Sequence, residues 1–299
     1  MKILHIVPGL DKLGNGIAVV AKLIAREQPA DLIEARRFAG GEGDVLKYDW
    51  VWVHSAWLPM VFRSCWRVLK AGRHLVRMSH ANYDPVRLAY HAWKKRLVSP
   101  IDRYYLRKAD KVIATCEAEA GWIRSYLGRR CPPVEVTDIK RFFNLNPFSS
   151  PIPHLSAIAS ETAGSPSLHL LYLGRRHPLK GLEYLEEAVK GVEGCELRVV
   201  SNAFGDEKEK VWEWCDVLVL PTLSENFGLV IAEALERGKR VITTDGAPAW
   251  NHEIHETQEK GVWSGYGGRL VYLKGYRDGT DKMRVRLLTE AIKRFQDKE

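Results

Sequence analysis

Four charged side chains have the types and the placement needed to hold an anionic, hydroxyl-bearing ligand. Arg175 and Lys180 belong to the turn GRRHPLKG, which lies between an apolar run and a helical pattern. Arginine bonds a phosphate through two parallel hydrogen bonds, and lysine adds a point charge. Glu225 and Glu233 supply carboxylates, which accept hydrogen bonds from hydroxyls. The combination indicates a site for a phosphate-bearing molecule that is rich in hydroxyls.

The stretch around the two glutamates, DVLVLPTLSENFGLVIAEALERGKRVITTD, has the pattern of a strand–helix–strand unit. Residues 217–220 form an apolar run that stops at Pro221, which is typical of a buried parallel strand. We expect a loop over residues 222–226, a helix over 227–237 and a second strand over 241–243. Ligands of open α/β sheets bind at the carboxyl ends of the strands, so this loop lies at the ligand-binding edge.

The start of that helix adds to the indication of an anion site. Its first amides, around Phe227, Gly228 and Leu229, lack an intrahelical acceptor and favour a negative charge. The spacing of eight between Glu225 and Glu233 carries little weight, because 23 glutamates in 299 residues give about two such pairs by chance. The position of the pair within the strand–loop–helix unit carries the argument.

These motifs resemble those of the retaining GT-B glycosyltransferases of family 4, also called glycosyltransferase group 1. The donor-binding motif of that family has a strand that ends in Pro, a small residue, Glu-x-Phe-Gly, and a second Glu eight residues after the first. LPTLSENFGLVIAEAL fits each of those points, and GRRHPLKG is similar to the turn whose Arg and Lys meet the donor diphosphate. The segment LRKADKVIATCEAEAGWI resembles the end of the family's first domain.

The resemblance implies an α/β fold of the GT-B type, with two Rossmann-like domains whose parallel sheets face each other across a cleft. It implies transfer of a sugar from a UDP- or GDP-linked donor to an acceptor, with retention and without a metal or another cofactor. Glu225 would hold sugar hydroxyls and Glu233 ribose hydroxyls, while Arg175 and Lys180 meet the charge of the leaving group. The implied donor-binding residues are Gly14, Gly16, Asn226, Phe227, Gly228, Leu229 and Glu233.

Two features of the first half fit the same resemblance. His80 follows an expected strand over residues 74–78, and the family has a histidine there that contacts the transferred sugar; a loop histidine with satisfied hydrogen bonds is the alternative. Gly14 and Gly16 follow the first expected strand. They fail the dinucleotide fingerprint because Val19 replaces its third glycine, but they resemble the family's first glycine-bearing loop. A plain flexible turn remains the alternative.

Length and patterning indicate two domains. Proline and serine gather over residues 144–167, which we interpret as a linker between a domain over 1–143 and a domain over 168–299. The second domain is expected to be shortened, because one strand–helix pair of the family is missing before Asp216. The remaining expected strands cover residues 2–7, 49–54, 110–115, 134–137, 169–173, 196–201 and 269–273. The remaining expected helices cover residues 17–27, 58–70, 117–127, 182–190, 208–214 and 282–295.

Composition limits the class of protein. Five scattered cysteines without a Cys-x-x-Cys pair indicate free thiols, and no metal site is expected. No apolar run reaches the length of a transmembrane helix, and the start MKILHIVPGL lacks the layout of a signal peptide. We therefore expect a cytoplasmic protein.

Charge is uneven along the chain. Residues 1–150 carry 25 Lys and Arg against 14 Asp and Glu, and residues 151–299 carry 20 against 23. Apolar residues recur at helical spacing within residues 86–111, beside eight cations. This pattern is typical of an amphipathic helix at an anionic membrane surface, although a core stripe with a solvated cationic face gives the same pattern. The candidate membrane or acceptor-side patch consists of Trp93, Lys94, Lys95, Arg96, Arg103 and Arg107.

The expected partners follow from these observations. They are a nucleotide-sugar donor, a glycan or lipid-linked acceptor such as a cell-envelope precursor, and an anionic membrane, with the protein peripheral on its inner face. Nucleic acid is not an expected partner. Two alternatives stay open: another nucleotide-sugar enzyme of this fold, such as an epimerase, and a non-enzymatic basic module that binds a membrane or nucleic acid.

Overall fold

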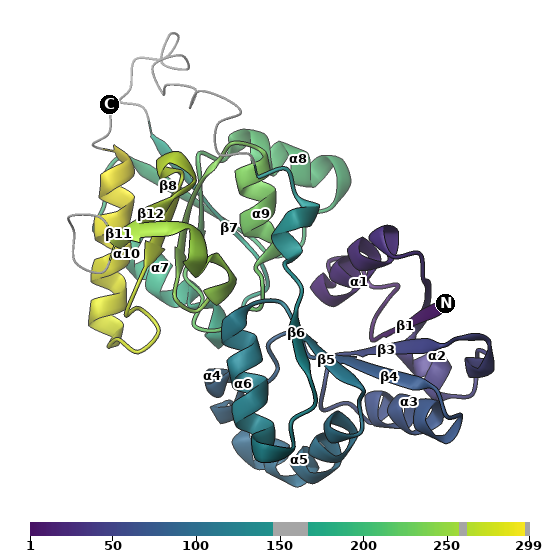
Figure 1. Ribbon diagram of the computed structural model, residues 1–299. Helices are drawn as coiled ribbons and strands as arrows, with labels where there is room; N and C mark the ends of the chain where they lie inside the picture. The colour runs from purple at the N-terminus through teal and green to yellow at the C-terminus, as the bar shows by residue number, and fades with distance from the viewer. Residues whose placement is uncertain (146–166, 257–261, 297–299) are drawn as a thin grey trace. The chain divides into compact units, whose positions relative to one another are not determined.

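A computed structural model describes residues 1–145, 167–256 and 262–296 (Figure 1). The chain divides into two compact units, Met1–Phe142 and Phe143–Glu299. Most of the expected linker over residues 144–167 lies outside the described residues.

The first unit contains, in its described residues, a six-stranded parallel sheet with the order β2-β1-β3-β4-β5-β6. The order reverses between β1 and β3, which makes the carboxyl ends of these two strands the topological switch point. The strands are β1 (Ile3–Val7), β2 (Asp31–Glu34), β3 (Trp50–His54), β4 (His74–Met78), β5 (Lys111–Ala114) and β6 (Val134–Val136). The helices are α1 (Gly16–Glu27), α2 (Ala35–Ala39), α3 (Pro59–Lys70), α4 (Pro85–Ala89), α5 (Ala92–Arg107) and α6 (Glu117–Leu127).

Helices cover both faces of this first sheet (Figure 1). Ile6 and Val53 point to the face where Cys65 of α3 packs against them. Val7 points to the opposite face, where it packs with Ala18 of α1. This division follows from the alternation of side chains along a strand, and burial on both faces explains why the inner strands are apolar throughout.

The sequence pattern did not predict β2 and α2. The strand Asp31–Glu34 lies at the edge of the sheet, where its side chains are exposed or half-buried. It therefore lacks the apolar run that marks the inner strands. The carboxylate of Glu34 caps α2 by accepting hydrogen bonds from the amides of Arg36 and Arg37.

The prediction of one amphipathic helix within residues 86–111 is wrong, because the chain breaks between α4 and α5. His91 has a φ of 55°, in the left-handed region. Lys95 stabilises the break, since its Nζ donates hydrogen bonds to the carbonyl oxygens of Arg87 and Tyr90. The last carbonyls of a helix need such donors, so Lys95 caps α4.

The second unit contains, in its described residues, a seven-stranded sheet with the order β11-β12-β13-β10-β9-β7-β8. The strands from β13 to β8 are parallel, and β11 and β12 add two antiparallel pairs. The strands are β7 (Leu168–Leu173), β8 (Cys195–Val200), β9 (Val217–Leu220), β10 (Arg240–Thr244), β11 (Ile254–Glu256), β12 (Val262–Gly265) and β13 (Leu270–Leu273). The α-helices are α7 (Leu182–Val189), α8 (Gly205–Trp214), α9 (Leu229–Glu236) and α10 (Asp281–Gln296).

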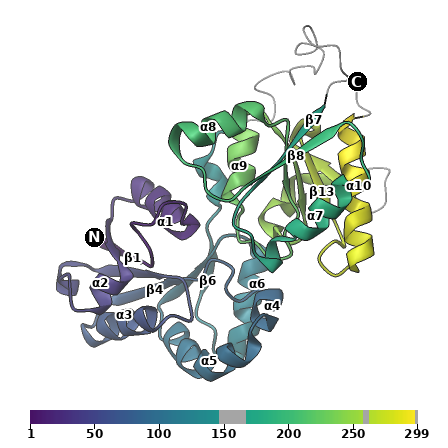
Figure 2. The same cartoon turned by 180° about the vertical axis from the view of Figure 1, so that it is seen from behind.

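Figure 2 shows α8 and α9 on one side of the second sheet and α7 and α10 on the other. The core between the sheet and the second pair joins Val219 and Ile242 to Leu185 of α7 and Leu288 of α10. The final helix therefore packs on the unit that contains the GRRHPLKG turn and helps to hold α7, which follows that turn. One helix, α8, connects β8 to β9.

We predict that Leu288→Ala lowers the urea midpoint of the second unit. Leu288 is fully buried, so truncation leaves a cavity that costs about 2–5 kcal/mol of unfolding free energy. Arg286→Ala on the same helix is the control, because that side chain is two-thirds exposed (66%) and its replacement changes stability by about 0.5 kcal/mol or less. Equal midpoints for the two variants would contradict the packing of α10.

Candidate functional site

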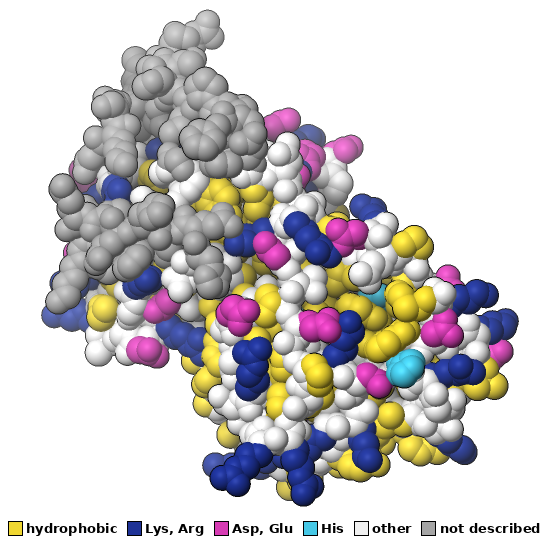
Figure 3. Space-filling view, viewed as in Figure 1, with side chains coloured by type: hydrophobic (Ala, Val, Ile, Leu, Met, Phe, Trp, Pro, Cys, Tyr) yellow, Lys and Arg dark blue, Asp and Glu magenta, His cyan; other side chains and the backbone are white. Residues whose placement is uncertain are grey.

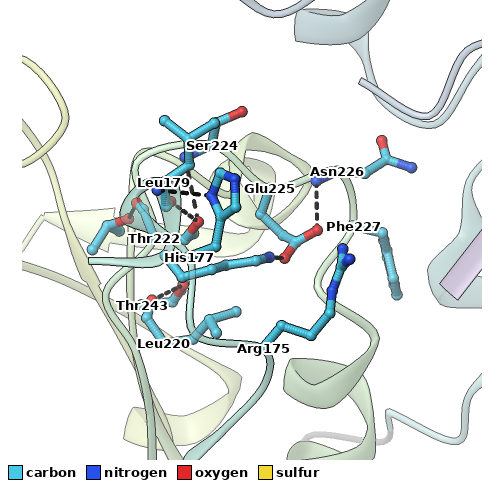
Figure 4. A network of polar contacts seen from close by, with 12 residues as sticks. Arg175, His177, Leu179, Leu220, Thr222, Ser224, Glu225, Asn226, Phe227 and Thr243 are labelled. Atoms are coloured by element: carbon cyan, nitrogen blue, oxygen red, sulfur yellow. Dashed lines mark hydrogen bonds and ion pairs between the residues drawn. The ribbon is translucent and has the colours of Figure 1, made fainter. Parts of the chain in front are cut away.

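Three loops meet at the carboxyl edge of the second sheet, at the switch point beside β7 and β9 (Figure 4). The carbonyl oxygen of Leu179 accepts hydrogen bonds from Thr222 Oγ1 at 3.0 Å and from the Leu223 amide at 2.9 Å. The Glu225 amide donates to the carbonyl oxygen of Gly246 at 2.8 Å. These bonds tie together the loops that follow β7, β9 and β10.

Two glycines permit this close approach of backbones. A Cβ on Gly181 would lie 2.1 Å from the carbonyl oxygen of Pro221, and a Cβ on Gly246 would lie 2.0 Å from that of Thr222. Gly181 also has a φ of 63°. Both positions exclude any residue with a side chain, so these glycines fix where the neighbouring charged residues stand.

Lys180 and Glu225 form an ion pair at the centre of this edge. The Nζ of Lys180 donates to Oε2 of Glu225, and the two side chains are 16% and 17% exposed. The second carboxylate oxygen, Oε1, accepts the Asn226 amide at 2.9 Å. A charge held this far from water needs a partner, so each side chain fixes the other in place.

Arg175 lies directly after β7 and is exposed. Its side chain extends toward Glu225 and Phe227 (Figure 4). Within the described part of the chain its guanidinium makes no hydrogen bond or ion pair, whereas the adjacent Arg176 pairs with Glu186 at 3.1 Å. The arrangement offers an approaching anion one unpaired guanidinium next to a paired ammonium.

Helix α9 starts at Leu229, two residues later than the sequence pattern indicates. Gly228 caps it with a φ of 70°, and a Cβ there would lie 2.9 Å from Cδ1 of Ile231. Phe227 is 2% exposed, its ring packs against Trp250, and its carbonyl oxygen accepts the indole hydrogen bond. Phe227 thus anchors the loop in the core, and the helix amides begin at Leu229.

Glu233 lies on α9 and pairs with a residue that the sequence analysis missed. The Nζ of Lys208, on α8, lies 2.6 Å from Oε2 of Glu233. Both side chains are about one-quarter exposed. No spacing in the sequence connects the two residues; they meet because α8 and α9 cover the same side of the sheet (Figure 2).

In the first unit, His80 follows β4 at the carboxyl edge of the sheet. His80 and Ala81 have φ values of 55° and 57°, a conformation that costs energy for residues other than glycine. Buried Glu119 holds this turn: its Oε1 accepts Ser79 Oγ at 2.7 Å and the Ala81 amide. Its Oε2 accepts the amide and the hydroxyl of Thr115, both at 2.8 Å.

His80 is also the outer member of a row of three buried histidines. Its Nε2 lies 2.9 Å from Nδ1 of His54, and Nε2 of His54 lies 2.9 Å from Nδ1 of His5. Burial lowers the pKa of His80 to about 3 and the pKa of His5 to about 4. Burial, with the neighbouring rings and Arg77, holds the pKa of His54 well below its ordinary value. All three imidazoles are therefore neutral near pH 7.

The turn with Gly14 and Gly16 follows β1. Asn15 closes it, because its Nδ2 donates to the carbonyl oxygens of Pro8 and Gly9 at 2.7 and 2.8 Å. The side-chain oxygen of Asn15 caps α1. Gly14 has a φ of 70°, and both glycines are exposed.

The predicted basic patch divides into structural and solvent-facing cations. Arg103 packs over the ring of Tyr126 at 4.5 Å, Arg107 donates to the carbonyl oxygen of Leu127 at 2.9 Å, and Lys95 caps α4. The exposed members of the patch that make no such bond to the backbone are Trp93, Lys94 and Arg96.

The apolar stripe of α5 is not part of the core. Trp93, Leu97, Ile101 and Tyr104 recur at intervals of four, four and three residues, and they are 64%, 72%, 48% and 54% exposed. Figure 3 shows Lys and Arg side chains gathered along the lower edge of the first unit, where Figure 1 places α5. The sequence pattern that we weighed as a core stripe consists of Val86, Tyr90, Trp93 and Leu97. The core interpretation is wrong for Trp93 and Leu97, while Val86 and Tyr90 are half-buried.

Two models of protein families match the sequence. A "Glycosyl transferase 4-like domain" matches residues 8–138, and "Glycosyl transferases group 1" matches residues 154–266, so that the two together take in most of the chain. The chain belongs to the group 1 glycosyltransferases. No curated protein matches this glycosyltransferase.

Solved structures show that this glycosyltransferase has the GT-B fold. Sucrose-phosphate synthase from Thermosynechococcus elongatus is similar with a TM-score of 0.63 and 14% identity, over 100% of this chain and 90% of that one. HepE from Anabaena, in complex with UDP-glucose, gives 0.63 and 16%, over 99% and 91%. A glycosyltransferase from Rickettsia africae gives 0.57 and 13%, over 98% and 87%. At these identities the likeness concerns the fold.

We predict that Gly246→Ala destabilises the second unit, because the new Cβ would collide with the carbonyl oxygen of Thr222 and separate the loops after β9 and β10. Overpacking of this kind costs about 1–3 kcal/mol. Gly121→Ala is the matched control: Gly121 lies inside α6, has no atom within 4 Å of its added Cβ, and its replacement stabilises by about 0.5–1 kcal/mol. Differential scanning calorimetry measures both, and a melting temperature for Gly246→Ala at or above that of the wild type would contradict the loop packing.

Proposed function

We propose that this glycosyltransferase moves a sugar from a UDP- or GDP-linked donor to a cell-envelope glycolipid or polysaccharide precursor, with retention of anomeric configuration. The observation that carries the proposal is the pair Lys180–Glu225 with the unpaired guanidinium of Arg175 beside it, at the switch point of the second sheet. Such an edge has the charge that a nucleoside diphosphate needs and the carboxylate that a sugar hydroxyl needs.

The chemical problem is the charge of the leaving group. When the bond between the anomeric carbon and the diphosphate oxygen breaks, negative charge grows on the diphosphate. The acceptor oxygen bonds the anomeric carbon, and its proton passes to the departing diphosphate oxygen. Arg175, Lys180 and the first amides of α9 at Leu229 meet that charge. We propose that these groups act without a metal or another cofactor.

We propose that binding of the donor rearranges the ion pair of Lys180 and Glu225. A diphosphate attracts the ammonium of Lys180 more strongly than a single carboxylate does, because it carries more charge. Donor binding then turns the Glu225 carboxylate from its partner toward a hydroxyl of the sugar. Glu233, which pairs with Lys208, takes the ribose hydroxyls in the same way.

The remaining donor contacts come from loops that the fold already holds. We propose that the backbone around Asn226, Phe227 and Gly228 faces the diphosphate, that Gly14 and Gly16 also bind the donor, and that His80 contacts the sugar. Among similar structures, HepE is in complex with UDP-glucose, which makes UDP the first nucleotide to test.

An epimerase of the same fold is the second candidate, since it also binds a nucleotide sugar. It differs in one respect that is easily measured: an epimerase consumes its substrate without an acceptor, and a transferase releases nucleoside diphosphate in proportion to acceptor glycosylated. A thermal-shift screen with UDP, GDP, UDP-glucose and GDP-mannose identifies the base first, because a ligand of the folded state raises the melting temperature.

We predict that Arg175→Ala weakens binding of the nucleoside diphosphate found in that screen by about ten- to a hundredfold. A hydrogen bond to a charged group contributes about 1.5–3 kcal/mol. Arg176→Ala is the control, because the side chain of Arg176 is exposed and pairs with Glu186. Isothermal titration calorimetry compares the two variants, and equal dissociation constants would overturn the assignment of the phosphate site.

We propose, as a separate point, that the exposed stripe of α5 contacts an anionic membrane and brings the enzyme to a lipid-linked acceptor at the inner face. None of the helices in the described part of the chain has the length and apolar character to span a bilayer, so the contact would be interfacial. Trp93 and Tyr104 suit the headgroup region, and Lys94 and Arg96 flank the stripe with positive charge.

We predict that the double variant Lys94→Ser, Arg96→Ser binds vesicles of phosphatidylglycerol and phosphatidylcholine roughly thirtyfold more weakly than the wild type, because each cation near such a surface contributes about 1 kcal/mol. Trp93→Ser weakens binding as well. Trp66→Ser is the control, since Trp66 is half-exposed on α3, away from the stripe in sequence. Sedimentation with the vesicles measures binding, and unchanged binding by the double variant would exclude α5 as the contact.

A further inference from the structure

The row His5–His54–His80 crosses three neighbouring strands of the first sheet. His5 lies on β1, His54 is the last residue of β3, and His80 follows β4, and these strands are adjacent in the order β1-β3-β4. His5 is opposite Trp52 in the register, so its side chain and that of His54 point to the same face. The three side chains are 0%, 0% and 4% exposed. The proposed mechanism uses only His80, and the other two histidines have no role in it.

The row restricts where the protons lie. A neutral imidazole has one N–H donor and one bare nitrogen acceptor, so a hydrogen bond between two rings needs a donor on one and an acceptor on the other. Because His54 is bonded on both sides, its proton fixes the direction of both bonds. Only two placements of the protons keep all three rings neutral and both hydrogen bonds intact. The two placements differ in whether the outer nitrogens of His5 and His80 carry a proton.

In the first arrangement all three protons lie on Nδ1. His5 then donates to His54, His54 donates to His80, and Nε2 of His5 is bare. In the second arrangement all three protons lie on Nε2, and the Nε2 of His5 becomes an N–H group. That atom is buried and has no hydrogen-bond partner among the described residues. An orphaned buried donor is rarer in proteins than an under-satisfied acceptor, which favours the first arrangement.

We propose that His5 and His54 are positioning residues that hold His80 as a neutral imidazole with its proton on Nδ1. Within the described chain that nitrogen makes no hydrogen bond, so it presents an N–H donor at the carboxyl edge of the sheet. A hydrogen bond from this N–H group to an oxygen of the bound sugar rests on the function proposed above. The tautomer of the His80 ring does not depend on that function.

The row is not arranged as a metal site. Two pairs of ring nitrogens lie 2.9 Å apart, one between His5 and His54 and one between His54 and His80. Each of these nitrogens faces one neighbouring ring, so the three rings do not point at a shared position where a metal ion could bind. The low pKa of His5 and His80 supports neutral rings over a proton-carrying chain. The left-handed turn at His80 and Ala81, held by Glu119, fixes the backbone from which the third ring reaches the row.

We predict a single tautomer of His80 in the wild-type protein. Long-range ¹H–¹⁵N correlation spectra at pH 7 separate a protonated ring nitrogen from a bare one, and His80→Gln identifies its signals by their loss. We expect one set of signals for His80, with the proton on Nδ1. A proton on Nε2, a mixture of the two, or a charged ring would overturn the proposal.

Variants of His54 test whether the row imposes that state. His54→Phe removes both hydrogen bonds, so we expect His80 to become a mixture of tautomers. His54→Asn places an amide near the position of Nδ1, where its NH2 group donates to Nε2 of His80, so we expect a larger share of the Nδ1–H tautomer than in His54→Phe. His5→Phe serves as a second test if His54→Phe does not fold. His74→Asn is the control, since His74 is an exposed residue of β4. A single unchanged tautomer of His80 in both phenylalanine variants would overturn the positioning role.

Turnover with UDP-glucose separates this inference from the proposed function. We expect His54→Phe to lower kcat by about three- to tenfold, in line with one neutral hydrogen bond, with KM less affected and with recovery in His54→Asn. An unchanged kcat alongside the expected spectra would exclude an action of the row on the reaction. If no nucleotide sugar binds the wild type, the proposed function fails, while the spectra still decide the state of His80.

Discussion

Close contact between backbones at the carboxyl edge of the second sheet is the constraint that holds the charged residues of this edge in place. The turn that ends at Gly181 lies against Pro221, and the loop that begins at Gly246 lies against Thr222, at distances that leave no room for a Cβ. Hydrogen bonds to the carbonyl oxygen of Leu179 then lock the loops. Because the loops cannot separate, the charged groups that they carry face one another.

Two ion pairs balance most of the charge at this edge. Lys180 and Glu225 neutralise each other in a place that is largely shielded from water, and Lys208 does the same for Glu233. Each of these two carboxylates is thus held by a lysine, which lowers the cost of its partial burial. Arg175 alone among these charges makes no such bond within the described residues, and its side chain extends toward Glu225 and Phe227.

The first unit differs from this edge because it presents an uncharged polar group, the imidazole of His80. Glu119 accepts two hydrogen bonds from the strained turn at His80 and two from Thr115, and the histidine row fixes the ring. Neither could be predicted from the sequence. Glu119 looks like an ordinary helix residue, and His5 and His54 look like polar residues within apolar strands. Their partners are remote in the chain, and only the order of the strands makes them neighbours.

The sequence by itself determined the family, the alternation of strands and helices, and the turn that contains Arg175 and Lys180, because each of these depends on residues that are close in the chain. Edge strands such as β2 could not be predicted, because they bury little apolar surface and therefore lack an apolar run in the sequence. The break at His91 could not be predicted for another reason. Lys95 of α5 caps α4 through a side-chain hydrogen bond, and this contact follows only from the positions of the two helices. The tertiary structure alone decided which charges pair, which apolar residues of α5 stay exposed, and which histidines join, because these contacts connect segments that the chain keeps apart and the sheet brings side by side.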